Sequence, residues 1–318
     1  MRALSMLTLL AALLAGCPAP EEAPRAGAAP PGDKPLVLAT VAMVGDVARA
    51  VVGDHATVEV LIGEGTDPHT YTASRGDVAR LHAAGIILYN GLHLEGRMAA
   101  DLEGLASTKV VVPVAERIPR ELLLEADGEH DPHVWMDPAR WAHVADVVAA
   151  VLSGEDPANA QDYEANAAAY RAELARLDER ARAAVTTIPD GRRVLVTAHD
   201  AFSYLGQSYG IEVLALQGLS TESEAGLADI NALVDAIVTR RIPAVFVETS
   251  VAEKNVRALV EGAKARGHEV ALGGSLFSDA MGAAGTREGT YLGMIDHNVS
   301  TIVRALGGQV PEGGLMAP

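Results

Sequence analysis

Short apolar runs rich in β-branched residues alternate with helical patterns along most of this 318-residue chain, and this alternation limits the fold more than any other feature. Strands separated by amphipathic helices pair in parallel and become covered by helices on both faces. We therefore predict an α/β protein with parallel sheets flanked by helices. The predicted strands are residues 36–41, 57–62, 86–89 and 109–114, and then 193–197, 212–216, 244–248 and 269–272.

A segment of different character, residues 158–188, separates the two sets of strands. It contains neither glycine nor proline, and its apolar residues recur at helical spacing. A helix of about 28 residues would extend about 42 Å at 1.5 Å per residue. We predict one long rigid helix that joins two pseudo-symmetric lobes, residues 36–157 and 189–318. The alternative is an ordinary long helix inside one domain. The apolar positions are Tyr163, Tyr170, Leu174, Leu177, Ala181 and Val185.

The first 16 residues have the layout of a secretory signal peptide, with Arg2 followed by an apolar stretch that is too short to span a bilayer. The run from Leu14 to Cys17 resembles the lipobox of bacterial lipoproteins, in which the cysteine becomes the lipid-modified N-terminus. A plain signal peptide with a chance cysteine is the alternative. Cys17 is the only cysteine, so no intramolecular disulfide is possible.

Residues 17–35 are built mainly from proline, alanine, glycine and glutamate, and are predicted to be a flexible tether. Loss of residues 1–16 would change the formal charge from −17 to −18, because Arg2 is their only charged side chain. Such an acidic chain disfavours nucleic acid as a partner. We expect a monomer held by lipidated Cys17 on the periplasmic or cell-surface side of the cytoplasmic membrane.

Two near-identical tripeptides, Asp67-Pro68-His69 and Asp131-Pro132-His133, suggest where the chemistry lies. His199 and Asp279 also follow predicted strands, and open parallel sheets bind ligands at the carboxyl ends of strands. We predict that His69, His133, His199 and Asp279 form one metal site, with two ligands from each lobe. Three imidazoles and one carboxylate suit tetrahedral Zn²⁺; they also accept Mn²⁺, although nitrogen-rich sites favour Zn²⁺. For any single histidine, a surface role is the alternative.

Three further carboxylates have predicted supporting roles. Asp67 and Asp131 are expected to accept backbone N–H groups within their turns or to orient a ligand. Glu248 ends an apolar strand, where a carboxylate requires a partner. We expect it to fix the tautomer of a ligand imidazole, and a hydrogen bond to loop backbone is the alternative.

Several segments together resemble the zinc- and manganese-binding lipoproteins of bacterial ABC importers, of the TroA-like type, over essentially the whole chain after the tether. The resemblance implies two α/β lobes joined by one rigid helix, and an ion held in the cleft by His69, His133, His199 and Asp279. It also implies delivery of Zn²⁺ or Mn²⁺, as cargo, to a membrane permease. The matching segments are residues 67–71, 89–95, 131–135, 196–202, 246–250 and 277–298.

The sequence departs from both specialised patterns of that family. Many manganese members carry glutamate where His199 stands, whereas many zinc members carry a long histidine-rich loop ahead of the second ligand. Here residues 125–131 are short and include only His130 besides acidic and small residues. We therefore expect tight Zn²⁺ binding in vitro and leave Mn²⁺ open as the physiological cargo.

Two other functions are alternatives to metal capture. A zinc-dependent hydrolase would use a three-histidine site, but such an enzyme needs an open coordination position and a general base, and Asp279 would close the coordination sphere. A chelate, haem or cobalamin carrier would need a large aromatic pocket, and the chain has three Phe and two Trp residues. We predict a binding protein that is not an enzyme.

Overall fold

The computed structural model describes residues 34–126 and 128–317. The predicted signal peptide, Cys17 and nearly all of the predicted tether lie outside these residues. Pro35, which we assigned to the tether, already takes part in the fold because its carbonyl accepts a hydrogen bond from the Thr57 backbone N–H (2.9 Å). No helix among the described residues is long and apolar enough to cross a bilayer.

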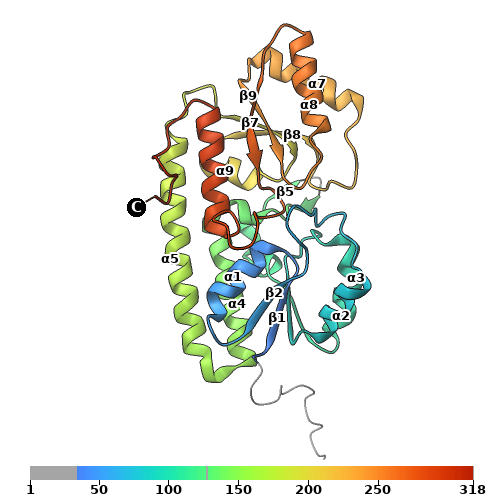
Figure 1. The fold of residues 1–318 in the computed structure, drawn as a ribbon, viewed down its shortest axis with the longest axis vertical. Coiled ribbons are helices and arrows are strands. Elements are labelled where there is room, and N and C mark those ends of the chain that lie inside the picture. The colour runs from blue at the N-terminus through green and yellow to red at the C-terminus, as the bar shows by residue number, and fades with distance from the viewer. Residues whose placement is uncertain (1–33, 127, 318) are drawn as a thin grey trace, which may run out of the picture. The chain divides into compact units, whose positions relative to one another are not determined.

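The first half of the described chain forms a four-stranded parallel sheet in the order β2-β1-β3-β4. Helices lie on both of its faces, with α1 and α4 on one and α2 and α3 on the other (Figure 1). The strands are β1 (Leu36–Ala39), β2 (Thr57–Val60), β3 (Ile86–Tyr89) and β4 (Val110–Pro113). The helices are α1 (Ala42–Val52), α2 (Arg75–Ala83), α3 (Ala99–Ala106) and α4 (Pro138–Glu155). A short antiparallel pair, β5 (Glu125–Ala126) and β6 (Glu129–His130), precedes α4.

The second half has a similar arrangement, in which two hydrogen-bonded strand pairs lie side by side; we call these four strands the second sheet. β7 pairs in parallel with β8, β9 pairs in parallel with β10, and β7 lies beside β9 (Figure 1). The spatial order is therefore again second strand, first, third, fourth. The strands are β7 (Val194–His199), β8 (Glu212–Gln217), β9 (Ala244–Glu248) and β10 (Ala271–Leu276). The helices are α6 (Ser203–Tyr209), α7 (Leu227–Arg240), α8 (Lys254–Ala265) and α9 (Tyr291–Ala305). The prediction of parallel sheets flanked by helices is confirmed.

Most predicted strands begin and end within two residues of the observed ones, but the predicted end of the last strand was wrong. We predicted residues 269–272, and β10 instead covers Ala271–Leu276. Gly273 and Gly274 read as a loop in the sequence. In the structure the register shifts between Leu272 and Gly274, so the strand continues through this irregularity and carries the chain further toward Asp279.

The predicted long helix exists as α5 (Ala160–Val185), which follows a 3₁₀ turn at Pro157–Asn159. It is 26 residues long and shorter than the predicted segment at both ends, because the 3₁₀ turn replaces the first residues and the helix ends at Val185, ahead of residues 186–188. All six apolar positions named from the sequence are buried. The helix packs against α1 and α4 in the first half and against α6 and α9 in the second, and it runs along the side of both sheets (Figure 1).

One continuous apolar core includes residues from both halves, such as Leu38, Trp135, Leu174 and Tyr291. A smaller second core lies under the second sheet, where it includes Val196 and Leu259. A hydrogen bond also links α5 to α1, since the Tyr170 hydroxyl donates to Asp46 Oδ2 (2.9 Å). Because Phe246 and Leu276 belong to the continuous core, one side of the second sheet is packed into the same core as the first half.

Candidate metal centre

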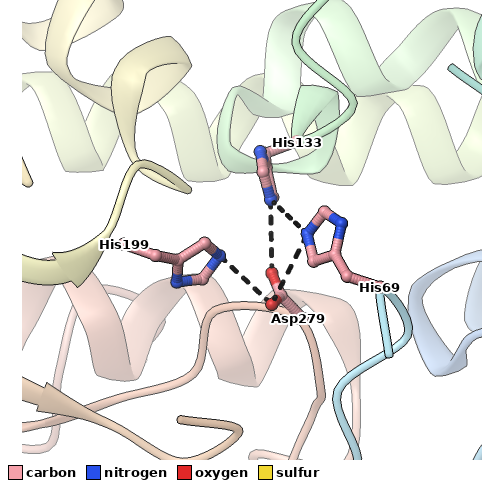
Figure 2. A group of neighbouring side chains, drawn as sticks. All are labelled: His69, His133, His199 and Asp279. Carbon is pink, nitrogen blue, oxygen red and sulfur yellow. Dashed lines mark hydrogen bonds and ion pairs between the residues drawn. The ribbon is translucent and has the colours of Figure 1, made fainter. Parts of the chain in front are cut away.

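The four predicted residues converge at one buried point. His69, His133, His199 and Asp279 each offer one ligand atom, and these atoms all lie within 4.8 Å of one another. Figure 2 shows the three imidazoles pointing toward the Asp279 carboxylate from different segments of the chain. All four residues are buried. The sequence prediction of their convergence therefore agrees with the structure.

The separations of these atoms suit a single metal ion. His69 Nε2 lies 3.3 Å from His133 Nε2, His133 Nε2 lies 3.4 Å from Asp279 Oδ1, and His199 Nε2 lies 3.2 Å from Asp279 Oδ2. The fourth separation, from His69 Nε2 to Asp279 Oδ2, is 4.0 Å. Zinc–ligand bonds of about 2.0–2.1 Å in a tetrahedron place neighbouring ligand atoms about 3.3–3.4 Å apart. Three of the four separations are close to this value.

Buried polar atoms in this group lack hydrogen-bond partners among the described residues. They are Nε2 of His199 and both carboxylate oxygens of Asp279. Such atoms are costly to bury without a partner. A cation bound at their centre would satisfy them, so the donor set fits a divalent metal ion.

The Asp-Pro-His turns are built by the aspartate side chains. Asp67 Oδ1 accepts the His69 backbone N–H (2.9 Å), and Asp131 Oδ1 accepts the His133 backbone N–H at the same distance. This side-chain bond to the residue two positions later is typical of an Asx turn. Asp131 Oδ1 also lies 2.7 Å from His133 Nδ1, so Asp131 both forms its turn and orients the imidazole.

Glu248 makes both of the contacts considered in the sequence analysis, one with a ligand imidazole and one with the backbone. Its Oε1 accepts the backbone N–H groups of Ala198 (2.8 Å) and His199 (3.0 Å), at the end of β7. Its Oε2 lies 2.5 Å from His199 Nδ1. An Nδ1–H that donates to this carboxylate leaves Nε2 of His199 directed at Asp279. His199 is the last residue of β7, and α6 begins four residues later, at Ser203.

Charges in the site are strongly coupled. Burial lowers the pKa of His133, but Asp131 and Asp279 outweigh this effect and raise the pKa of His133 to about 9. Burial also opposes a charge on His199, yet Asp279 and Glu248 hold the pKa of His199 well above its ordinary value. Burial would raise the pKa of Asp279, but the two imidazoles hold it well below its ordinary value. The group therefore combines an ionised carboxylate with protonated imidazoles at neutral pH.

His69 behaves differently. Burial is the largest influence, and it lowers the pKa of His69 to about 4, although Asp279 acts in the opposite direction. This imidazole is consequently neutral at pH 7 and has a free lone pair for a metal. Protons therefore compete with a metal ion less strongly at His69 than at His133 and His199.

Residues to which the sequence analysis assigned no individual role cross-link the segments of the site. Trp135 Nε1 donates to the Ser278 carbonyl (2.9 Å), which ties the turn after His133 to the segment of Asp279. The Tyr204 hydroxyl donates to the Asp131 carbonyl (3.0 Å). Asn90 Nδ2 donates to the Pro132 carbonyl (3.1 Å). These contacts join residues far apart in the chain, so local sequence patterns carry no signal for them.

The remaining histidines lie outside the four-residue group. His130 ends the β5–β6 hairpin, where its Nδ1 lies 3.6 Å from Glu125 Oε1. His297 lies on α9, and its ring nitrogen Nε2 contacts the Ser275 carbonyl (2.9 Å). Among the residues that the structure describes, the group around Asp279 is the one whose ligand atoms converge closely enough to hold a metal.

The fold thus combines parallel sheets flanked by helices with a buried group of three histidines and one aspartate that could hold a metal ion. The chain belongs to the family described as "Zinc-uptake complex component A periplasmic", whose profile matches residues 37–305. This result confirms the family resemblance seen in the sequence.

Curated relatives agree with the family. The chain is 47% identical over 272 residues to the "Manganese-binding lipoprotein MntA" of Bacillus subtilis (strain 168), covering 85% of this chain and 89% of that protein. It is 46% identical over 275 residues to the "Zinc-binding protein TroA" of Treponema pallidum (strain Nichols), covering 86% and 89%. These two relatives are named for different metals.

Solved structures share the fold. The periplasmic zinc-binding protein TroA from Treponema pallidum superposes with a TM-score of 0.84 at 46% identity, covering 86% of this chain and 99% of that one. The Fe(III)-bound YtgA from Chlamydia trachomatis superposes with a TM-score of 0.79 at 30% identity, covering 87% and 100%. The fold is therefore that of solute-binding proteins of the TroA type.

Proposed function

We propose that this protein captures one Zn²⁺ or Mn²⁺ ion outside the cytoplasm and delivers it to the permease of an ABC importer. His69, His133, His199 and Asp279 are the proposed ligands. The observation that carries the proposal is their buried convergence, with three of the four ligand-atom separations close to those around one tetrahedral ion. The metals named for the two relatives, manganese and zinc, support the same cargo class.

Three imidazole nitrogens favour Zn²⁺ over Mn²⁺ at equilibrium. Asp131 and Glu248 would orient His133 and His199 and add negative charge beside the ion. Together with Asp279, these carboxylates surround the ligands with three formal negative charges. Because of the three imidazole ligands, we propose that the purified metal-free protein binds Zn²⁺ more tightly than Mn²⁺ in vitro, whichever metal the cell supplies.

The location and organisation of the protein form part of the same proposal. Residues 1–16 would be removed as a signal peptide, and lipidated Cys17 would hold a monomer to the membrane through the tether of residues 17–35. The relatives whose names include "lipoprotein" support an anchored, extracytoplasmic protein. Residues 36–157 and 189–318 would act as two lobes, joined by the helical segment 158–188.

No catalytic step is part of this proposal. A zinc hydrolase keeps one coordination position open for water or substrate. Here Asp279 supplies a fourth donor, and the family consists of transporter components. The protein would hold the ion and release it unchanged.

Equilibrium dialysis followed by elemental analysis tests the capture of an ion. The wild-type protein is expected to retain one Zn²⁺ per chain. His199→Ala should weaken Zn²⁺ binding by at least about tenfold, because it removes a ligand and leaves Glu248 without its imidazole partner. His297→Ala is the matched control, since His297 lies on α9 outside the group. Equal Zn²⁺ affinity in the wild type and His199→Ala would contradict the assignment.

A further inference from the structure

The three imidazoles of the metal site are not supported equally. Asp131 lies 2.7 Å from Nδ1 of His133, and Glu248 lies 2.5 Å from Nδ1 of His199. Among the described residues, no hydrogen bond is recorded for Nδ1 of His69. His69 also retains a small exposed fraction, 4%, whereas His133 and His199 have none. His69 is therefore the imidazole whose ring is least restrained.

The segments that carry the other ligands are held by hydrogen bonds to buried neighbours. Ser278, beside Asp279, accepts from Trp135 through its carbonyl and shares a hydrogen bond with the Ser250 hydroxyl (2.8 Å). Asn298 on α9 bonds both the N–H and the carbonyl of Phe277 (2.9 and 2.7 Å). A shift of Asp279 would break several of these bonds at once.

The turn that carries His69 has a different support. Asp67 Oδ2 accepts from the Thr70 hydroxyl (3.1 Å) inside the turn and from the Thr221 hydroxyl (2.5 Å) outside it. Thr221 lies on residues 218–226, the loop between β8 and α7, which we call the strap. The strap starts beside the His199 segment, where the Gly218 carbonyl accepts the Asp200 N–H (3.2 Å). It thus connects the segments of two ligands.

A second contact of the strap contributes less. Arg97 Nε donates to Glu222 Oε1 (2.9 Å), and both side chains are about half exposed. Exposed ion pairs of this kind add little free energy because water and salt screen them. A hydrogen bond to a partly buried carboxylate, such as that from Thr221 to Asp67, contributes more. Thr221 therefore forms the stronger of these two contacts, and it is the one that reaches the turn of His69.

A cavity of about 250 Å³ lies between the loop that leads to His69 and the segment of Asp279. Glu64 and Thr66 line it from the first segment, and Asp279 and Met281 line it from the second. The cavity therefore reaches one ligand and is bordered by the loop that carries another. Movement of that loop would detach His69 and widen the cavity in the same step.

We propose that the turn carrying His69 is the gate of the metal site, and that Thr221 is a positioning residue that latches this gate and sets the rate at which the ion leaves. This inference rests on the proposed function. The ion stays bound by His133, His199 and Asp279 when the gate opens, and then escapes through the widened cavity. Thr221 acts through Asp67 and does not touch the ion.

Stopped-flow release of Zn²⁺ from the loaded full-length protein into excess chelator tests the latch. Thr221→Val keeps the shape of the side chain and removes the hydroxyl. Its release rate constant is expected to be about tenfold higher than that of the wild type, the size expected for loss of one hydrogen bond to a carboxylate. Thr221→Ser keeps the hydroxyl and should restore a release rate within about twofold of the wild type.

Thr108→Val is the matched control, because the Thr108 hydroxyl donates to the Leu105 carbonyl at an exposed helix end and to no other group in the described part of the chain. It should leave release unchanged. An unchanged release rate in Thr221→Val, or a failure of Thr221→Ser to restore it, overturns the latch. The number of ions bound per chain separates the two proposals. If the wild type holds one Zn²⁺ and Thr221→Val releases it at the wild-type rate, only the latch is overturned. If the wild type holds no Zn²⁺, the proposed function is overturned as well.

Discussion

At the scale of single residues, the site depends on pairs in which a carboxylate holds an imidazole. Asp131 bonds both the backbone and the ring of His133, and Glu248 does the same for His199. One carboxylate thus fixes where the ring stands and which nitrogen carries the proton. The nitrogen that remains faces Asp279 in both cases (Figure 2).

Replacement of Glu248 by glutamine tests this role. The glutamine side chain could still accept backbone N–H groups through its oxygen, but its NH₂ group cannot accept a hydrogen bond from His199 Nδ1–H. Loss of such a partner typically lowers metal affinity about 10–100-fold, and we expect Glu248→Gln to do so in a Zn²⁺ competition titration. Glu95→Gln is the control, because Glu95 is also a buried carboxylate but bonds Thr40, Asn90 and Gly91. Unchanged affinity in Glu248→Gln would refute the role.

Protons should compete with the metal. Asp131 and Asp279 overcome burial and raise the pKa of His133 to about 9, and Asp279 and Glu248 raise that of His199, so at pH 7 in the metal-free protein both rings carry a second proton and are cationic. A metal needs neutral imidazoles, so binding at pH 7 must release these protons, and affinity must fall as pH falls. We expect nearly two protons released per ion, measured by calorimetry in buffers of different ionisation enthalpy. Buffer-independent heats would contradict this.

At the scale of elements, most of the site follows from strand ends. His199 is the last residue of β7, and His69 follows β2. The sequence could predict these positions because parallel strands bring their carboxyl ends to one edge of a sheet. It could not predict that β10 continues through Gly273 and Gly274, because consecutive glycines normally indicate a loop. Nor could it reveal Thr221, whose bond to Asp67 exists only in the tertiary structure.

The segment between Asp279 and α9 offers a test of packing at this scale. A Cβ at Gly293, in the first turn of α9, would lie 1.8 Å from the Arg287 carbonyl oxygen, so that backbone would have to move. We expect Gly293→Ala to cost about 1–3 kcal/mol in the free energy of unfolding and to weaken Zn²⁺ binding, because the displaced segment carries Asp279.

Gly104→Ala is the matched control for that substitution. Gly104 lies within α3, and a Cβ there would meet no atom within 4 Å. Alanine inside a helix should stabilise the protein by about 0.5–1 kcal/mol and leave metal binding unchanged. Urea denaturation and Zn²⁺ titration of both variants measure the two effects. Equal stabilities for Gly293→Ala and the wild type would show that the segment accommodates the added methyl group.

At the scale of the whole described chain, the two sheets share a core. Apolar residues of α5 and α9 pack with those of the first sheet, and Tyr291 on α9 donates its hydroxyl to the Trp135 carbonyl (2.7 Å). Large hinge motions need an interface that can separate. Here separation would expose much of that core, so local movement of a ligand-bearing loop costs less than opening the two halves. The gate at His69 is a movement of this smaller kind.

Anomalous scattering from crystals of the Zn²⁺-loaded protein, recorded on both sides of the zinc absorption edge, tests the central claim most directly. The account predicts one strong peak per chain, about 2.0–2.2 Å from Nε2 of His69, His133 and His199 and from an Asp279 carboxylate oxygen. A dominant peak elsewhere, or a fully loaded protein with no peak among these four side chains, would contradict it.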